Sequence, residues 1–215
     1  MTGTCVHLLR HGAPLRPGLL HGHNDEPSAD PTGGLAGTLP AGLTISHIVS
    51  SDLRRALAGA ESLSRQLGAT LTVDDRWREL DFGDWNGALP ARLDHHALAR
   101  FWQDPESDPP PGGERWSGLM ARVAAALADV PADALVVTHG GAMRAAIAVL
   151  TGLDPRQVWA VDLPCRALLS LRIWPGDRLA GQIVALRPGT RREGGDRCAA
   201  VHDPAAPARR GRDKP

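Results

Sequence analysis

The sequence has no tyrosine, only two phenylalanines and only three cysteines among its 215 residues. Cys5, Cys165 and Cys198 are odd in number and far apart, which argues against a disulfide framework and fits a reducing cytoplasm. Lysine plus arginine equals aspartate plus glutamate at 24 each, so no net charge favours nucleic acid or an anionic membrane. No apolar run approaches the ~20 residues of a membrane span, and the N-terminus lacks the pattern of a signal peptide. We therefore expect a cytoplasmic protein without nucleic-acid or membrane partners.

The remaining composition is that of a globular domain, with 42% hydrophobic and 22% charged residues. Residues 1–187 have the length and patterning of one domain with a single core. Residues 188–215 are rich in Gly, Pro, Ala and Arg and contain few side chains to bury. The sequence therefore predicts one folded domain followed by a disordered C-terminal tail.

Hydrophobic periodicity predicts strands that alternate with helices. Short apolar runs at 5–10, 47–51 and 134–139 are typical of buried parallel strands. Apolar residues recur at helical spacing from 53 to 67, with Ser51 as a candidate N-cap and Gly68 at the end. The same patterns predict helices at 89–104, 113–130 and 140–152 and late strands at 166–174 and 181–186. This order predicts an α/β fold, a three-layer α/β/α sandwich with a mostly parallel central sheet.

Histidine and arginine stand where the predicted strands end, which is where open α/β sheets bind ligands. His11 and His139 each end a strand and are followed by glycine, which lets the backbone approach a ligand closely. The helix beginning near Gly140 offers free N–H groups to an anion. Arg54 and Arg55 open another helix, an unfavourable place for two cations unless something negative lies nearby. One such feature is more often a surface loop, but several at one edge predict a phosphate pocket.

Four motifs carry a resemblance to a known family. "LLRHG", "SSDLRRA", "RELDFGDWNG" and "VVTHGG" follow the order and spacing of the histidine phosphatase superfamily, the phosphoglycerate-mutase-like group. The resemblance covers roughly residues 4–175 and implies the phosphoglycerate mutase-like fold. It also implies a hydrolase that removes phosphate from small-molecule esters through a phosphohistidine.

The resemblance assigns roles that periodicity leaves open. His11 resembles the phosphorylated nucleophile and Arg10 its phosphate clamp, with His139 beside them. Helical spacing cannot choose between the two neighbouring arginines, but the family motif places the catalytic arginine directly before alanine, which selects Arg55. The motif also places the acid that protonates the leaving group at Glu79.

Within the superfamily the chain is most similar to small phosphatases of the α-ribazole phosphatase type. The similar stretches are "GH" at 22–23, "PPGGERWSGLMARV" and "GLDPRQVWAVDLPCRALLSLRI". This similarity implies hydrolysis of α-ribazole 5′-phosphate in cobalamin biosynthesis. The expected substrate-binding residues are Arg10, Arg55, His139, Gly140, His23 and Asn24.

Three alternatives stay open from the sequence. They are a broad-specificity phosphatase, a cofactor-dependent enzyme like phosphoglycerate mutase, and a domain that binds a phospho-ligand without turnover. Ala13 and Pro17 stand where family members commonly carry Glu and Asn, which leaves the substrate contacts of residues 13–42 open. The oligomeric state is also open, with a homodimer as one option.

The scheme needs no cofactor and no metal. "HGHND" and "DHH" contain candidate metal ligands, but neither has a strong metal-binding spacing, and surface histidines are the usual interpretation of His95 and His96. We expect the tryptophans near the site to pack chiefly in the core, although one or two could stack on a flat substrate. They are Trp77, Trp85, Trp102 and Trp116.

Overall fold

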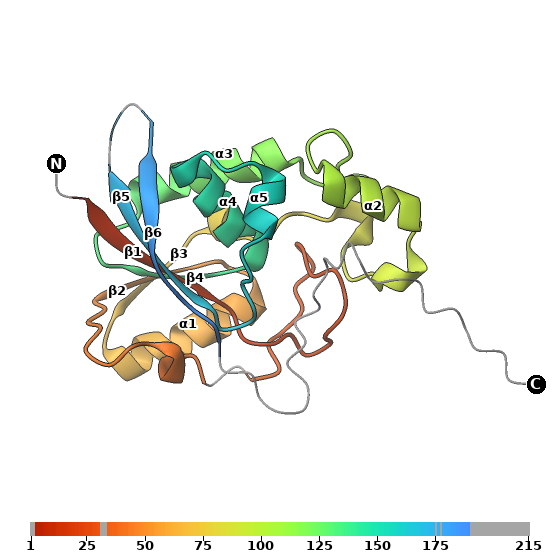
Figure 1. Cartoon of the computed structure of the whole chain (residues 1–215). Coiled ribbons are helices and arrows are strands. Elements are labelled where there is room, and N and C mark those ends of the chain that lie inside the picture. The colour runs from red at the N-terminus through yellow and green to blue at the C-terminus, as the bar shows by residue number, and fades with distance from the viewer. Residues whose placement is uncertain (1–2, 31–33, 175, 177, 190–215) are drawn as a thin grey trace, which may run out of the picture.

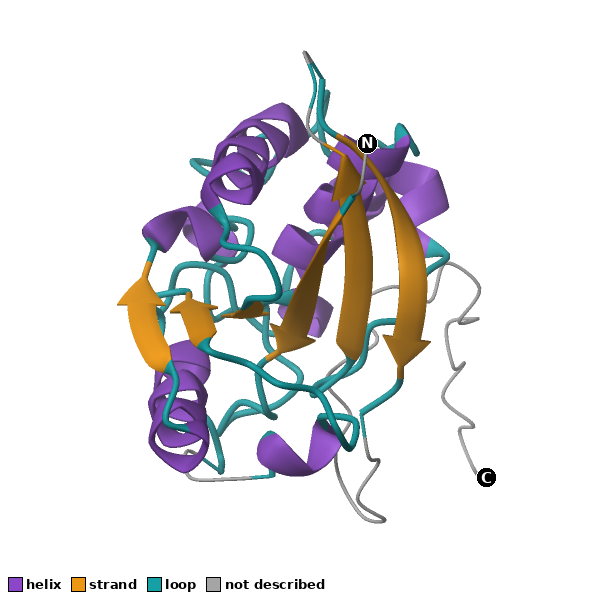
Figure 2. Cartoon of the chain, turned by 90° about the vertical axis from the view of Figure 1, so that its left-hand side faces the viewer, coloured by secondary structure: helices purple, strands orange, loops and turns teal. Residues whose placement is uncertain are grey.

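The computed structural model describes residues 3–30, 34–174, 176 and 178–189. A six-stranded sheet with the order β3-β2-β4-β1-β5-β6 forms its centre. The strands are β1 (Thr4–Arg10), β2 (His47–Ser50), β3 (Thr70–Val73), β4 (Leu135–Thr138), β5 (Leu168–Trp174) and β6 (Ala180–Arg187). The first four pair in parallel, whereas β5 and β6 join as antiparallel strands. Figure 2 shows the long strands together on one side and short ones on the other.

Helices cover both faces of this sheet, as the three-layer prediction requires. Figure 1 shows α1 on one face and α3, α4 and α5 on the other, with α2 beyond the end of the sheet. The bounds are α1 (Arg54–Leu67), α2 (His95–Gln103), α3 (Trp116–Asp129), α4 (Gly140–Thr151) and α5 (Pro155–Trp159). Single 3-10 turns lie at Ala36–Thr38, Asp75–Trp77, Gly83–Trp85 and Pro90–Arg92. The predicted fold class is confirmed.

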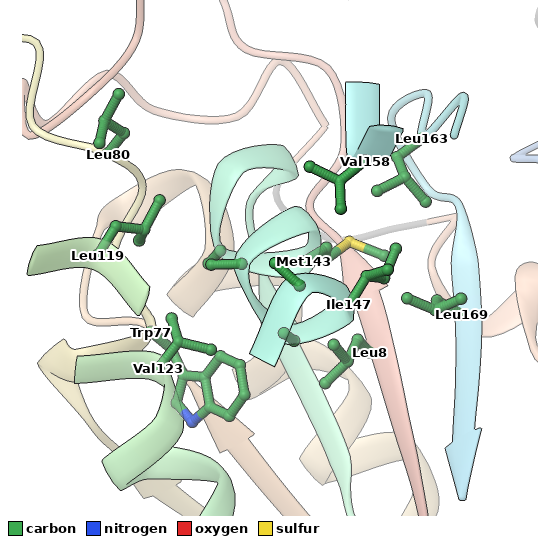
Figure 3. Close-up of a cluster of buried hydrophobic side chains, with 14 of the residues drawn as sticks. Leu8, Trp77, Leu80, Leu119, Val123, Met143, Ile147, Val158, Leu163 and Leu169 are labelled. Atoms are coloured by element: carbon green, nitrogen blue, oxygen red, sulfur yellow. The ribbon is translucent and has the colours of Figure 1, made fainter. Parts of the chain in front are cut away.

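Alternation along the buried strands divides the core in two. In β4, Leu135 and Val137 pack in the cluster of α1, which includes Ala56. Val136 belongs to the larger cluster on the other face, which includes Met143 of α4; Figure 3 shows this larger cluster. Because successive strand side chains point to opposite faces, one continuous apolar strand supplies both layers.

The start of α1 differs from the prediction. Leu53 occupies the N-cap position without a side-chain cap, so the N-cap expected at Ser51 is wrong. The Ser51 hydroxyl instead lies 2.9 Å from Nε2 of His139. Asp25, from the loop after β1, accepts the backbone N–H of Arg54 at 2.8 Å and places a negative charge at this helix end.

The structure bears on three further expectations, which concern disulfides, membrane spans and the C-terminal tail. Cys5 is a free thiol, but Cys165 is disulfide-bonded, so the expected absence of disulfides is wrong there. Within the described ranges, no helix has the length and apolarity needed to cross a membrane. The tail expected at 188–215 lies outside the described residues from 190 onward, so the domain division stays a prediction.

Candidate active site

His11 directly follows β1 and is 4% exposed. Its Nδ1 lies 2.5 Å from the carbonyl oxygen of Gly12. A carbonyl can only accept, so Nδ1–H donates this bond and Nε2 keeps its lone pair. Burial lowers the pKa of His11 well below its usual value, and the charges of Arg55 and Arg10 lower it further. His11 is therefore a neutral imidazole whose free Nε2 can act as a nucleophile.

His139 stands across from His11 at the N-terminus of α4. The two ring centroids are 5.0 Å apart, and His139 is completely buried. Its Nε2 faces the Ser51 hydroxyl, while its buried Nδ1 has no hydrogen-bond partner among the described residues. Burial and then the charge of Arg55 hold the pKa of His139 well below its usual value. If the Ser51 hydroxyl donates to Nε2, Nδ1 carries a proton that it can offer to an anion.

The two arginines at the start of α1 lie in opposite environments. Arg54 is exposed, whereas Arg55 is 1% exposed. The Arg55 guanidinium donates to the carbonyl oxygens of His21, Gly22 and Asn24 at 2.9, 2.6 and 2.9 Å. Burial lowers the pKa of Arg55 to about 10, so it stays charged at neutral pH. The loop after β1 therefore holds a buried cation beside both histidines.

Arg10 brings a second cation to the same place from the end of β1. Its Nη1 donates to the carbonyl oxygen of Leu163 at 2.5 Å. An ideal Cβ at position 140 would lie 3.2 Å from Arg10 Cζ, so glycine lets α4 begin close to the guanidinium. Burial lowers the pKa of Arg10, and the nearby Glu79 and Asp162 oppose this shift. Like the Nε of Arg55, its Nε is buried and has no partner among the described residues.

Glu79 supplies the carboxylate of the cluster and is 8% exposed. Its Oε1 accepts the backbone N–H groups of Leu80 at 2.9 Å and of Gly141, in the first turn of α4, at 2.8 Å. A Cβ at position 141 would lie 2.1 Å from this oxygen, so glycine is required for the contact. The start of α4 therefore fixes the position of this carboxyl group beside the histidines.

His23 and Asn24 pack against these groups from the loop after β1. The His23 Nε2 lies 2.9 Å from the carbonyl oxygen of Glu79. The backbone carbonyl of Asn24 accepts from Arg55, and its side-chain amide lies 3.1 Å from His21 Nδ1. The structure thus gathers every residue predicted for the site in one cluster: Arg10, His11, His23, Asn24, Arg55, Glu79, His139 and Gly140.

The sequence analysis missed a further, half-buried cation in this cluster. Arg144 on α4 lies with its Nη1 3.2 Å from the ideal Cβ position of Gly140 and with Cζ 4.5 Å from the ring centre of Trp159. Burial, and next the charge of Arg10, lower its pKa to about 10. An arginine within an otherwise apolar helix, one turn after the His-Gly-Gly stretch, is the signal that could have found it.

Other candidates from the sequence lie elsewhere. In the described ranges, no three His, Cys, Asp or Glu side chains gather as metal ligands would. His95 and His96 are exposed at the start of α2. Trp77 and Trp116 are 0% and 4% exposed and belong to the larger core cluster, which leaves them no face for a substrate.

A neutral imidazole nucleophile, buried cations and a carboxylate within one cluster suit the transfer of a phosphoryl group. The sequence profile of the histidine phosphatase superfamily (branch 1) matches residues 6–182. The chain belongs to this superfamily. The matched range contains both strand-end histidines, the two arginines that the motifs select, and Glu79.

Two curated relatives come from bacteria. "Putative phosphoserine phosphatase 2" of Hydrogenobacter thermophilus is 32% identical over 54% of this chain and 61% of its own length. "Glucosyl-3-phosphoglycerate phosphatase" of Mycobacterium tuberculosis is 36% identical over 49% of this chain and 54% of its own length. The chain thus spans between about half and three fifths of the length of these two relatives.

Solved structures share the fold over most of the chain. "Mycobacterial hydrolase 2" has a TM-score of 0.75 and 26% identity over 90% of this chain and 94% of its own. The "putative alpha-ribazole-5'-P phosphatase" of Escherichia coli has a TM-score of 0.71 and 20% identity over 88% of this chain and 100% of its own. The second likeness is one of fold alone.

Proposed function

We propose that the protein is a phosphomonoesterase that forms a phosphohistidine at His11. The observation that carries this proposal is the combination of a free Nε2 on His11 with buried, unpaired donors on Arg10, Arg55 and His139. Buried charges and polar groups normally find partners, because leaving them unpaired is costly. A phosphate ester supplies the negative oxygens that these donors lack.

In the first step, the Nε2 lone pair of His11 attacks phosphorus in line with the bond to the leaving oxygen. The N–P bond forms as the P–O bond breaks, and protonated Glu79 gives its proton to the departing alkoxide. Arg10 and Arg55 donate to the equatorial phosphoryl oxygens, because planar guanidinium groups match phosphate geometry. The Nδ1–H of His139 donates to the same group, which stabilises the charge of the transition state.

In the second step, water attacks the phosphohistidine and the Glu79 carboxylate accepts a proton from it. The new P–O bond forms as the N–P bond breaks, so inorganic phosphate leaves and His11 returns to its neutral state. Glu79 is thereby ready, as the acid, for the next cycle. The positive charge that this chemistry needs comes from side chains, and we propose that no metal takes part.

Two substrate classes follow from different observations. The sequence motifs favour α-ribazole 5′-phosphate, a step of cobalamin biosynthesis. The names of the curated relatives favour a second class, phosphate esters that also carry a carboxylate, such as phosphoserine or glucosyl-3-phosphoglycerate. Both classes need the same phosphoryl-transfer cluster and differ only in what the leaving group contacts.

The test is phosphate release in EDTA from α-ribazole 5′-phosphate, phosphoserine, 3-phosphoglycerate and p-nitrophenyl phosphate, with His11→Ala as control. We expect release that EDTA does not reduce and that the control lacks; the best ester identifies the substrate class. Similar rates for all esters would favour a broad-specificity phosphatase. Transfer to a second substrate in place of water would favour the mutase, and phosphate binding without release would favour the silent binding domain.

A further inference from the structure

Glu79 lies in a segment that no regular element holds. Residues 78–82 run between the 3-10 turns Asp75–Trp77 and Gly83–Trp85, without helix or strand hydrogen bonds. The N–H groups of Leu80 and Gly141 hold one carboxylate oxygen of Glu79. The position of its backbone, from which the side chain reaches the leaving group, depends mainly on contacts from outside the segment.

One side chain supplies that restraint from α3. The guanidinium of Arg122 donates from Nη1 to the carbonyl oxygens of Arg76 and Arg78, at 2.8 and 2.7 Å. Its Nη2 donates to the carbonyl oxygen of Glu79 at 2.8 Å, the same oxygen that His23 reaches. Three carbonyls within four residues thus converge on one planar fork, whose donors have fixed relative directions.

Arg122 is itself held in place by Glu114. Its Nε and Nη2 donate to the two carboxylate oxygens of Glu114, each at 2.8 Å. The two side chains are only 19% and 18% exposed, so solvent screens this pair less than a surface ion pair. Glu114 also accepts the backbone N–H of Asp81 at 3.3 Å, which holds the segment on the other side of Glu79.

We propose that Arg122 is a positioning residue for proton transfer, which sets where the Glu79 carboxylate meets the leaving-group oxygen. The proposal rests on the proposed function, in which Glu79 is the acid. Arg122 binds the backbone of Glu79, and its charge also contributes to the lowered pKa of His139. A loss of charge near His139 should affect all esters alike, whereas a loss of Glu79 positioning should depend on the leaving group.

Leaving groups of different basicity separate this role from a general structural one. An alkoxide is strongly basic and must be protonated as it leaves, whereas p-nitrophenolate is weakly basic and leaves without help. Phenolate lies between them. The parameter kcat/KM reports the step that breaks the ester bond, even when hydrolysis of the phosphohistidine limits kcat.

The experiment measures kcat/KM of wild type and Arg122→Gln for p-nitrophenyl phosphate, phenyl phosphate and glycerol 1-phosphate. We expect the loss to grow with leaving-group basicity, reaching on the order of 10- to 100-fold for glycerol 1-phosphate, because small misplacements of a catalytic group have effects of that size. Arg122→Lys, which keeps the charge but can reach fewer carbonyls, should lose less. Equal losses for all three esters, or no loss, would overturn the proposal.

The matched control is Arg76→Gln. Arg76 also links the segment before Glu79 to α3, through its ion pair with Asp129, but its side chain does not contact Glu79. This variant should keep the wild-type ratio between the three esters. If a thermal unfolding curve shows that Arg122→Gln is not folded, Glu114→Gln takes its place. This substitution keeps the side-chain shape but weakens the hydrogen bonds that position Arg122.

Different results would overturn the proposed phosphatase activity and the role of Arg122. A wild-type protein that releases no phosphate from any ester overturns the proposed function and this inference with it. An active wild type with a flat response in both Arg122→Gln and Glu114→Gln overturns the inference alone.

Discussion

The arginines around His11 and those on the surface are charged in opposite surroundings. Arg55 is buried and Arg144 is half-buried; both donate to carbonyl oxygens and have pKa values lowered to about 10, with desolvation as the largest cause. Arg16 and Arg76 are partly exposed, and hydrogen bonds with carboxylates raise their pKa values. Among the described residues, Arg10, Arg55 and Arg144 form no ion pair, whereas Arg166, which is also buried near His11, pairs with Asp30.

We infer from this difference that an anion binds beside His11. The surface arginines pair with aspartate and glutamate, whereas Arg10, Arg55 and Arg144 lack such partners among the described residues. Burying uncompensated charge lowers the stability of the free protein. The arrangement is favourable only when a ligand brings the missing negative charge, which is the requirement of a phosphate ester.

Removing one buried cation should have the largest effect. We expect Arg55→Gln to lower kcat/KM for p-nitrophenyl phosphate by on the order of 10²–10³-fold, because a positioned donor to the transition state is lost. Steady-state kinetics would compare kcat/KM of this variant with that of Arg54→Gln, which changes the exposed arginine next to it. A similar loss in both variants would mean that burial does not mark the functional arginine.

An anion should stabilise the free protein by compensating the buried cations. At a phosphate or vanadate concentration of 100 times Kd, linkage gives about 2.7 kcal/mol of added stability. We expect thermal unfolding of wild type and of Arg76→Gln to show the full rise in Tm, and that of Arg55→Gln a much smaller one. Equal rises in all three would place the anion away from Arg55.

The protein should become less stable as the pH is lowered, because His11 and His139 are buried in their neutral form. Their pKa values in the folded state lie well below the ~6.5 of an unfolded chain, so below pH 6.5 the unfolded chain binds more protons. Tm should therefore decrease as pH falls from about 6.5 towards the folded pKa values, and stay level above it. Each histidine lowers the free energy of unfolding by at most ~1.4 kcal/mol for each pH unit of acidification. His139→Gln should reduce the slope; an unchanged slope would contradict the assignment.

Breaking the two surface ion pairs of Arg76, with Asp74 and Asp129, should have the smallest effect. We expect Arg76→Gln to lower the free energy of unfolding by about 1 kcal/mol or less, because solvent screens an arginine that is 35% exposed. Chemical denaturation would measure it, with kcat/KM unchanged. A loss as large as that of a core truncation would show that surface pairs carry the fold.

Much of the site could be predicted because its signals are local in the sequence. His11 and His139 each end an apolar run before glycine, and parallel strands bring such ends to one edge. The choice of Arg55 over Arg54 needed the family motif, since both lie at similar angles to the apolar stripe. Burial in the structure separates them clearly.

The remaining contacts had no side-chain pattern to reveal them. Arg122 binds backbone carbonyls, and any residue type at 76, 78 and 79 would offer the same oxygens. Serine is a common N-cap residue, so the sequence around Ser51 predicted a cap. Its hydrogen bond with His139 depends on the fold and has no local signal. Strand β3 has four residues, most of them exposed, so periodicity is too short to predict it. Helix α5 did have a signal, the capping box of Asp154 and Gln157.

The most direct test of the account is to trap the phosphorylated protein. Wild type is mixed with excess p-nitrophenyl phosphate, quenched in alkali, where phosphohistidine survives, and mapped by mass spectrometry. The account predicts a phosphoryl group on His11 that disappears during a chase without substrate at the rate of turnover. A phosphoryl group on another residue, or active protein that carries none while His11→Ala remains active, would contradict it.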